Sequence, residues 1–248
     1  MAVVRHANTD EFRGAEFIDA DMSGAWFREV NLTGATIRGA LLMDADIDGV
    51  IHGLKVNGVE VAPLVEAELD RLHPERVKLR ATTPDGMREA WSVVESFWGE
   101  TMARARAMSE ADRQRSVDEE WSLVETLRHL IHVIDMWFRR AVLLRPQPYH
   151  PLGVAATFVQ DPQALGLDVE VTPTFDEVAA VRAERMAQVR DYLATVTQDE
   201  LDRPRTPDPE PGDGSPEART ATACLHVLFN EEWTHHQFAV RDLDIITS

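Results

Sequence analysis

Large apolar residues recur at a spacing of five near the start of the chain. They are Phe12, Phe17, Met22, Phe27, Leu32, Ile37, Leu42 and Ile47. Alanine stands two positions before most of them, with Val30 as an exception. A period of five fits neither the 3.6-residue period of a helix nor the two-residue period of a flat strand. The pattern therefore predicts a coil of stacked repeats, because one unit alone cannot bury its apolar face.

Four later stretches carry apolar residues at three- and four-residue spacing, which is typical of amphipathic helices. The predicted helices cover about residues 87–108, 122–144, 174–193 and 221–243. Thr174, with Glu177 three residues later, has the pattern of a capping box at a helix start. Because such helices bury their apolar stripes against one another, the economical architecture for this part is a bundle of four helices.

The connecting segments carry turn signals. Asn57-Gly58 lies between two valines and predicts a two-residue hairpin turn, and Pro63 is expected to open a short helix. The segment 203–216 is rich in proline and glycine and predicts an exposed loop. We therefore divide the chain into a repeat coil (1–51), a hairpin and helix linker (52–84) and a helical domain (85–248).

Composition narrows the classes of function. The hydrophobic fraction of 44% and the charged fraction of 27% are ordinary for a soluble globular protein. A net charge of -18 repels nucleic-acid phosphates and anionic membranes, so direct binding to either is not expected. The sequence has no apolar run of transmembrane length and no signal-peptide core. The single cysteine, Cys224, excludes an internal disulfide framework, and a cytoplasmic location is expected.

The last predicted helix carries candidate metal ligands. Glu231 and His235 are four residues apart and share a helix face, and so do Glu232 and His236 one position later. A third ligand from a neighbouring helix would complete an open metal site, with the remaining positions left to water or substrate. His129, beside the apolar stripe of the second helix, is the candidate. Spacing alone leaves both registers open.

The two parts of the chain resemble known families. The five-residue repeats resemble the pentapeptide-repeat family over residues 11–51, which implies a short right-handed quadrilateral β-helix. The stretch Trp-Ser-x-x-Glu-x-Leu-x-His-Leu from residue 121, Glu-Glu-Trp-x-His-His from residue 231 and Arg-Asp-Leu from residue 241 together resemble the DinB/YfiT-like superfamily. This second resemblance covers about residues 85–247 and implies a four-helix bundle. The combined fold class is α+β.

The DinB resemblance also implies a metal site. Members usually bind a divalent metal through three histidines, one from helix two and a His-x-x-x-His pair from helix four. Transferred residue by residue, His129 matches the first ligand and His235 the last, whereas the middle histidine falls on Glu231. One carboxylate with two histidines suits zinc, nickel or iron, so the predicted metal ligands are His129, Glu231 and His235. The same departure from three histidines would also accompany a degenerate site that has lost its metal.

Two classes of function follow. The resemblance implies a metal-dependent hydrolase, or a transferase that uses a low-molecular-weight thiol as cosubstrate, acting on a small-molecule substrate. The alternative is a non-catalytic binding or protein-interaction module. DNA mimicry by the repeats is disfavoured, because eight repeats make two coils in that family and two coils stack to only about 10 Å. Bundles of the DinB family often pair, which implies that a homodimer can form.

Overall fold

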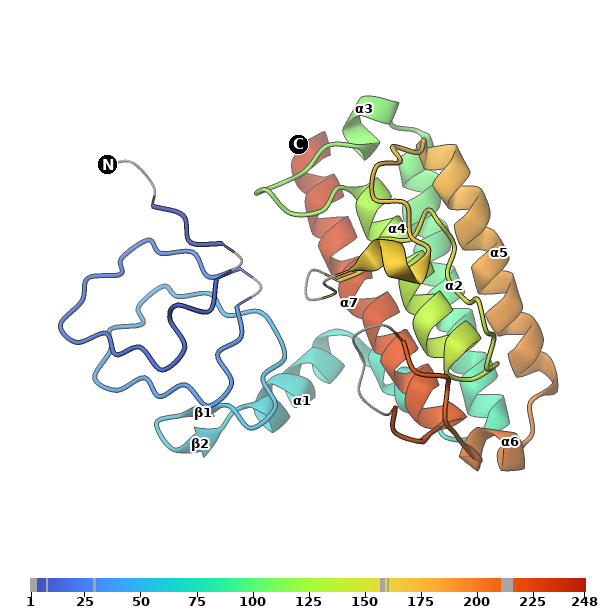
Figure 1. Ribbon diagram of the computed structural model, residues 1–248, viewed down its shortest axis with the longest axis horizontal. Coiled ribbons are helices and arrows are strands. Elements are labelled where there is room, and N and C mark those ends of the chain that lie inside the picture. Colours follow the sequence, from blue (N-terminus) through green and yellow to red (C-terminus); the bar gives the residue numbers. More distant parts are fainter. Residues whose placement is uncertain (1–3, 8, 29, 157–158, 160, 211–215) are drawn as a thin grey trace. The chain divides into compact units, whose positions relative to one another are not determined.

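The structure is a computed structural model, and it describes residues 4–7, 9–28, 30–156, 159, 161–210 and 216–248. The chain divides into two compact units, Met1–Ile47 and Asp48–Ser248. The first unit consists of turns and extended segments, and the second consists mainly of helices (Figure 1).

The backbone of the first unit repeats with the same five-residue period as its sequence. Left-handed φ angles occur at Gly14, Asp19, Gly24, Gly34, Gly39 and Asp44. Every ten residues an alanine amide donates to the carbonyl three residues earlier, as Ala25 does to Met22 at 3.0 Å. Glycine and aspartate suit these turns because they adopt positive φ more easily than other residues do.

The apolar side chains of this unit are not buried as the predicted coil would require. No β-strand occurs among the described residues between 11 and 47. The eight apolar side chains at five-residue spacing are 43% to 65% exposed, from Phe12 to Ile37. The structure thus shows a repeating chain of turns, and the right-handed β-helix with a buried core stays a prediction.

A hairpin and a helix open the second unit. Strands β1 (Lys55–Val56) and β2 (Val59–Glu60) pair in antiparallel fashion. Both turn residues between them, Asn57 and Gly58, have positive φ, as a tight two-residue hairpin requires. Helix α1 (Ala62–Leu72) begins with proline in its first turn, and a 3-10 helix, η1 (Pro74–Arg80), follows it. The hairpin and the proline-led helix are therefore as predicted from the sequence.

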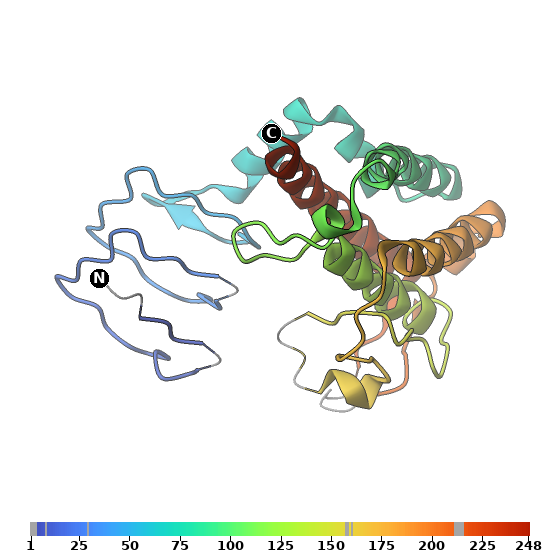
Figure 2. The ribbon, with the colours of Figure 1, turned by 90° about the horizontal axis from the view of Figure 1, so that it is seen from above.

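Four long helices form the body of the second unit. They are α2 (Pro84–Arg106), α4 (Leu123–Ile134), α5 (Phe175–Thr195) and α7 (Ala221–Thr247). Helices α2 and α4 each contact both α5 and α7, so the four lie side by side in a ring (Figure 2). Their apolar stripes meet in one core, where Trp91, Trp98 and Phe229 are almost fully buried. The four predicted amphipathic stretches are thus helices, with ends that differ by at most four residues, except that the second α-helix stops at Ile134.

The second predicted helix, expected over 122–144, changes character before its end. Ser122 caps the start of α4 in a capping box with Glu125. After Ile134 the chain continues as a π-helix, η2 (Asp135–Arg140). The fully buried Asp135 accepts a hydrogen bond from Arg185 of α5 at 2.7 Å. Apolar spacing did not predict the π-helix, because six residues are too few to show a period different from that of an α-helix.

Short elements complete the unit. They are α3 (Glu110–Arg113), η3 (Pro162–Leu165), α6 (Gln198–Asp202), β3 (Pro204–Arg205) and β4 (Arg219–Thr220). The predicted exposed loop 203–216 is only partly right, because β3 pairs with β4 and Pro207 is buried. Residues 211–215 of that loop lie outside the described residues. Within the described part of the chain, no helix has the length and apolarity needed to cross a membrane.

Candidate metal centre

Three side chains that can bind metal meet between α4 and α7. His129, Glu231 and His235 each offer one ligand atom, and these atoms all lie within 4.8 Å of one another. Nε2 of His129 is 3.7 Å from Oε2 of Glu231, and the rings of the two histidines are 4.7 Å apart. Donors around a four-coordinate zinc ion are separated by about 3.4 Å when the bonds are about 2.1 Å. The three side chains are therefore close enough to share one ion.

Helix geometry explains how two elements build this group. Glu231 and His235 lie one turn apart on α7, so both project from the same face. The capping box at Ser122 fixes the start of α4 and with it the position of His129 two turns later. Because α4 packs directly on α7, the third side chain faces the other two.

Backbone carbonyls lie next to one nitrogen of each imidazole. Nδ1 of His129 is 3.1 Å from the carbonyl oxygen of Val154, and Nδ1 of His235 is 3.0 Å from the carbonyl oxygen of Glu231. A carbonyl only accepts hydrogen bonds, so these contacts suit the tautomer in which Nδ1 carries the proton and donates. In that tautomer each Nε2 has a lone pair for a metal. Histidines that bind metal are commonly oriented by such a bond from the other nitrogen.

The charge states also favour binding of a cation. Burial lowers the pKa of His235 to about 4, so its imidazole is neutral at pH 7. Burial raises the pKa of the Glu231 carboxyl, but the neighbouring rings of His129 and His235 outweigh this effect and hold it below its usual value. Neutral imidazole and ionised carboxylate are the forms that bind metals.

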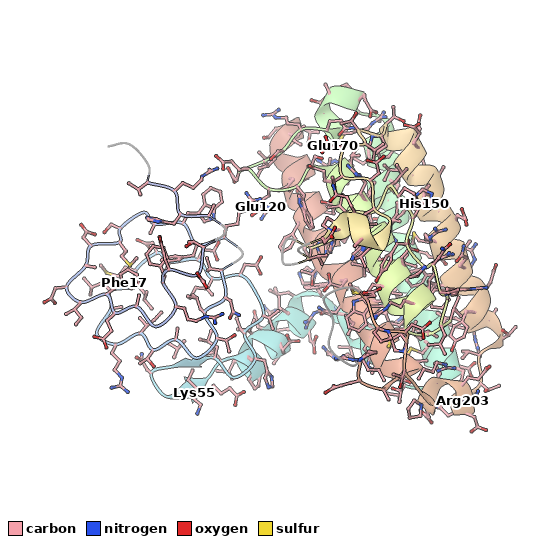
Figure 3. All side chains as sticks on the ribbon, in the orientation of Figure 1. Phe17, Lys55, Glu120, His150, Glu170 and Arg203 are labelled. Atoms are coloured by element: carbon pink, nitrogen blue, oxygen red, sulfur yellow. The ribbon has the colours of Figure 1, made fainter. Side chains whose placement is uncertain are left out.

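Trp121 covers the two imidazoles. Its ring lies 4.6 Å from that of His129 and stacks at 6.2 Å on that of His235. Glu120, labelled in Figure 3, accepts a hydrogen bond from Arg241 of α7 at 2.6 Å. Arg241 also donates to Asp242 at 2.7 Å. The Glu120–Arg241 pair ties the loop before α4, which carries Trp121, to α7, and Asp242 orients the same Arg241.

Comparison with protein families agrees with this architecture. The sequence model of the DinB superfamily matches residues 93–239, which is more than half of the chain. The chain belongs to the DinB superfamily. The match includes His129, Glu231 and His235. The pentapeptide-repeat model matches eight copies over residues 11–50, in the order predicted from the sequence. No curated protein and no solved structure matches the chain.

The alternative register on α7 faces other helices of the DinB domain. Glu232 is fully buried and accepts a hydrogen bond from Arg182 of α5. His236 is hydrogen-bonded to Thr101 of α2 at 2.8 Å, and its ring packs on Phe97. Among the described residues, neither Glu232 nor His236 joins the group around His129.

Two other histidines of the DinB domain lie outside the group. His226 is hydrogen-bonded to the carbonyl of Ala81 at 2.7 Å. His132 is buried one turn from His129 and stacks on Tyr149, and neither of its nitrogens has a hydrogen-bond partner among the described residues. Among the described residues, neither histidine belongs to the group of potential ligands around His129.

Sequence reasoning missed three features of the site. Val154 contributes only its backbone carbonyl, which leaves no signal in residue type. Trp121 belongs to the motif that resembles the family, but nothing in its spacing indicates that its ring covers the histidines. The Glu120–Arg241 ion pair links residues 121 positions apart, which is beyond the range of any helical pattern.

Proposed function

We propose that the DinB domain binds a divalent transition metal, namely zinc, nickel or iron, through His129, Glu231 and His235. In this proposal α2, α4, α5 and α7 form a DinB-like four-helix bundle, and the metal lies between two of its helices. The observation that carries the proposal is the meeting of two imidazoles and one carboxylate whose ligand atoms all lie within 4.8 Å of one another. A cytoplasmic location, a small-molecule substrate and a homodimer remain predictions from the sequence.

The proposed activity is that of a metal-dependent hydrolase or of a transferase that uses a low-molecular-weight thiol. A metal bound here would lower the pKa of a bound water or thiol and so supply a nucleophile at neutral pH. The protein's own contribution is positioning. Val154 orients His129, the Glu231 carboxylate balances part of the metal's charge, and Trp121 restricts access of water to the imidazoles.

A second candidate function is a non-catalytic binding or protein-interaction module with a degenerate site. It is favoured by the contacts of Glu231, whose Oε2 lies 3.4 Å from His235 Nδ1 and 3.7 Å from His129 Nε2. A carboxylate in this position can accept a hydrogen bond from a ring N–H or pair with a protonated imidazole, which would hold the three side chains together without a metal.

Elemental analysis separates the two functions. Protein purified without an affinity tag or chelator should contain about one equivalent of transition metal, and His129→Ala and His235→Ala should lose it. His226→Ala is the matched control on α7, because His226 bonds a backbone carbonyl away from the group, and it should keep its metal. A parent protein that takes up no zinc, nickel or iron after incubation would contradict metal binding and support the non-catalytic module.

The thiol branch has its own test. Cobalt-substituted protein titrated with cysteine or glutathione should develop a thiolate-to-cobalt charge-transfer band if the site accepts a thiol. A protein that binds cobalt without this band, yet hydrolyses ester or amide substrates, would favour the hydrolase.

A further inference from the structure

One buried arginine in the helical unit differs from the others. The buried arginines among the described residues are Arg76, Arg128, Arg182 and Arg185. Arg76 has carboxylate oxygens of Glu66 and Asp70 within 4.0 Å. Arg182 has one of Glu232, and Arg185 has one of Asp135. Arg128 has no such partner among the described residues, although the chain carries 43 acidic side chains.

Backbone carbonyls satisfy only part of the Arg128 guanidinium. Its Nε donates to the carbonyl of Leu152 at 2.9 Å, and Nη2 reaches the carbonyl of Asp168 at 3.5 Å. Nη1 has no hydrogen-bond acceptor among the described residues. Burial lowers the pKa of Arg128, and the nearby carboxylates of Glu125 and Asp168 offset this only in part. The guanidinium therefore has hydrogen-bond donors and a positive charge available to an anion.

A cavity of about 310 Å³ lies beside this guanidinium. Among the described residues, Arg128 and Glu125 are the charged members of its wall, and the others are small or apolar, including Ala155, Val159 and Leu167. This volume is at the small end of the range found for ligand pockets. The cavity thus combines one buried cation with apolar walls.

The acidic groups nearest Arg128 are engaged elsewhere. Glu125 accepts hydrogen bonds at 2.8 Å from both the amide and the hydroxyl of Ser122 at the start of α4. The Asp168 carboxylate accepts from the amide of Glu170 at 3.1 Å. Both raise the local negative potential but leave Arg128 without a direct ion pair. The presence of Glu125 on the wall disfavours a ligand with a second negative charge.

We propose that this cavity binds a small organic monocarboxylate. The carboxylate would pair with the Arg128 guanidinium, where charge-assisted hydrogen bonds are strongest, and a short apolar tail would occupy the space between Ala155, Val159 and Leu167. The proposal does not rest on the metal site, because none of the three candidate metal ligands lines the cavity.

Calorimetric titration of the full chain with hexanoate, benzoate and phenylacetate tests the proposal. We expect at least one of them to bind with one-to-one stoichiometry, and its neutral amide to bind at least about tenfold more weakly, because the amide lacks the charge that Arg128 requires. Absence of binding by all three acids, or equal binding of acid and amide, would overturn the proposal.

Two variants locate the binding site. Arg128→Met should weaken binding of the acid at least tenfold, whereas Arg106→Met, which changes an exposed arginine at the end of α2, should leave it unchanged. Ala155→Leu fills the cavity without removing the charge and should also abolish binding, so it decides the matter if Arg128→Met fails to fold. Binding that persists in Ala155→Leu would place the acid elsewhere and contradict the proposal.

Discussion

Glu231 and Glu232 are consecutive on α7, yet their carboxylates face different helices. Glu231 lies 3.7 Å from His129 of α4, with a side chain that is 32% exposed. Glu232 is fully buried and pairs with Arg182 of α5. Successive residues of an α-helix project about 100° apart, so one position separates a candidate ligand from an interior ion pair.

This difference predicts opposite effects for the same substitution. Glu231→Gln should weaken metal binding at least about tenfold, because an amide is a poorer ligand than a carboxylate, and should change the free energy of unfolding by less than about 1 kcal/mol. Glu232→Gln should keep the metal and lose about 3 to 5 kcal/mol, because it leaves Arg182 unpaired. Metal content and urea unfolding measure the two effects. If Glu232→Gln lost the metal and Glu231→Gln kept it, the other register would be the site.

The Arg182–Glu232 pair supports a second prediction. Nε and Nη1 of Arg182 and Oε1 of Glu232 have no hydrogen-bond partner among the described residues. A buried pair that is incompletely satisfied can be replaced by apolar residues at little cost. We expect the double variant Arg182→Met/Glu232→Leu to be much more stable than either single variant, with a coupling of about 3 kcal/mol in a double-mutant cycle. Additive losses would show that the pair does not act as a unit.

The sequence predicted the framework of the fold better than its details. Five-residue spacing identified the repeats, and Thr174 with Glu177 marked the start of α5, where both hydrogen bonds of the capping box are present. These signals lie within a few neighbouring residues, so they can be recognised without knowing which distant segments come into contact. The π-helix after Ile134 and the β3–β4 pair depend on contacts between distant segments, so no short pattern announces them.

The candidate site was predictable to a similar extent. The four-residue spacing indicated that Glu231 and His235 lie on the same helix face. The family resemblance selected His129 as the third candidate ligand. Spacing could not choose between the two registers on α7, because both put a glutamate and a histidine four residues apart. The choice depends on how α7 is rotated against α4, which is set by packing of the whole interior.

Acid should destabilise the protein partly through His132. Burial and the neighbouring His129 lower the pKa of His132 from 6.5 to about 4. In the unfolded chain it protonates near pH 6.5, so its contribution to stability is complete above that pH and is lost as the pH falls towards 4. The loss amounts to about 3 kcal/mol.

His132→Phe tests this pH dependence. Phenylalanine keeps the ring that stacks on Tyr149 at 5.1 Å but cannot bind a proton. Its free energy of unfolding, measured between pH 7.5 and 4.5, should fall less steeply than that of the parent. Some slope should remain, because His235 and His236 also have a pKa of about 4. An unchanged slope would show that His132 is not responsible.

Two glycines should respond to alanine in opposite directions. A Cβ on Gly153 would lie 3.2 Å from the carbonyl oxygen of His150 and 3.1 Å from Leu167, so Gly153→Ala should destabilise the protein by about 1 to 2 kcal/mol. Gly99 lies within α2 and would place its Cβ in open space, so Gly99→Ala should stabilise by about 1 kcal/mol. Thermal unfolding of both variants checks the signs. If Gly153→Ala instead stabilised the protein, the loop beside α4 would have to shift to accommodate the added Cβ at little cost.

The strip Leu152–Val154 binds two consecutive residues of α4. The carbonyl of Leu152 accepts from the Arg128 side chain, that of Val154 accepts from His129, and the Val154 amide donates to the Arg128 carbonyl at 3.2 Å. Opening of this strip would release both side chains at once. A ligand that restrains either side chain should therefore slow exchange of the Val154 amide hydrogen with solvent. If a metal binds at His129 and an acid at Arg128, as proposed above, each should strengthen the binding of the other through these three residues, without direct contact between the two ligands.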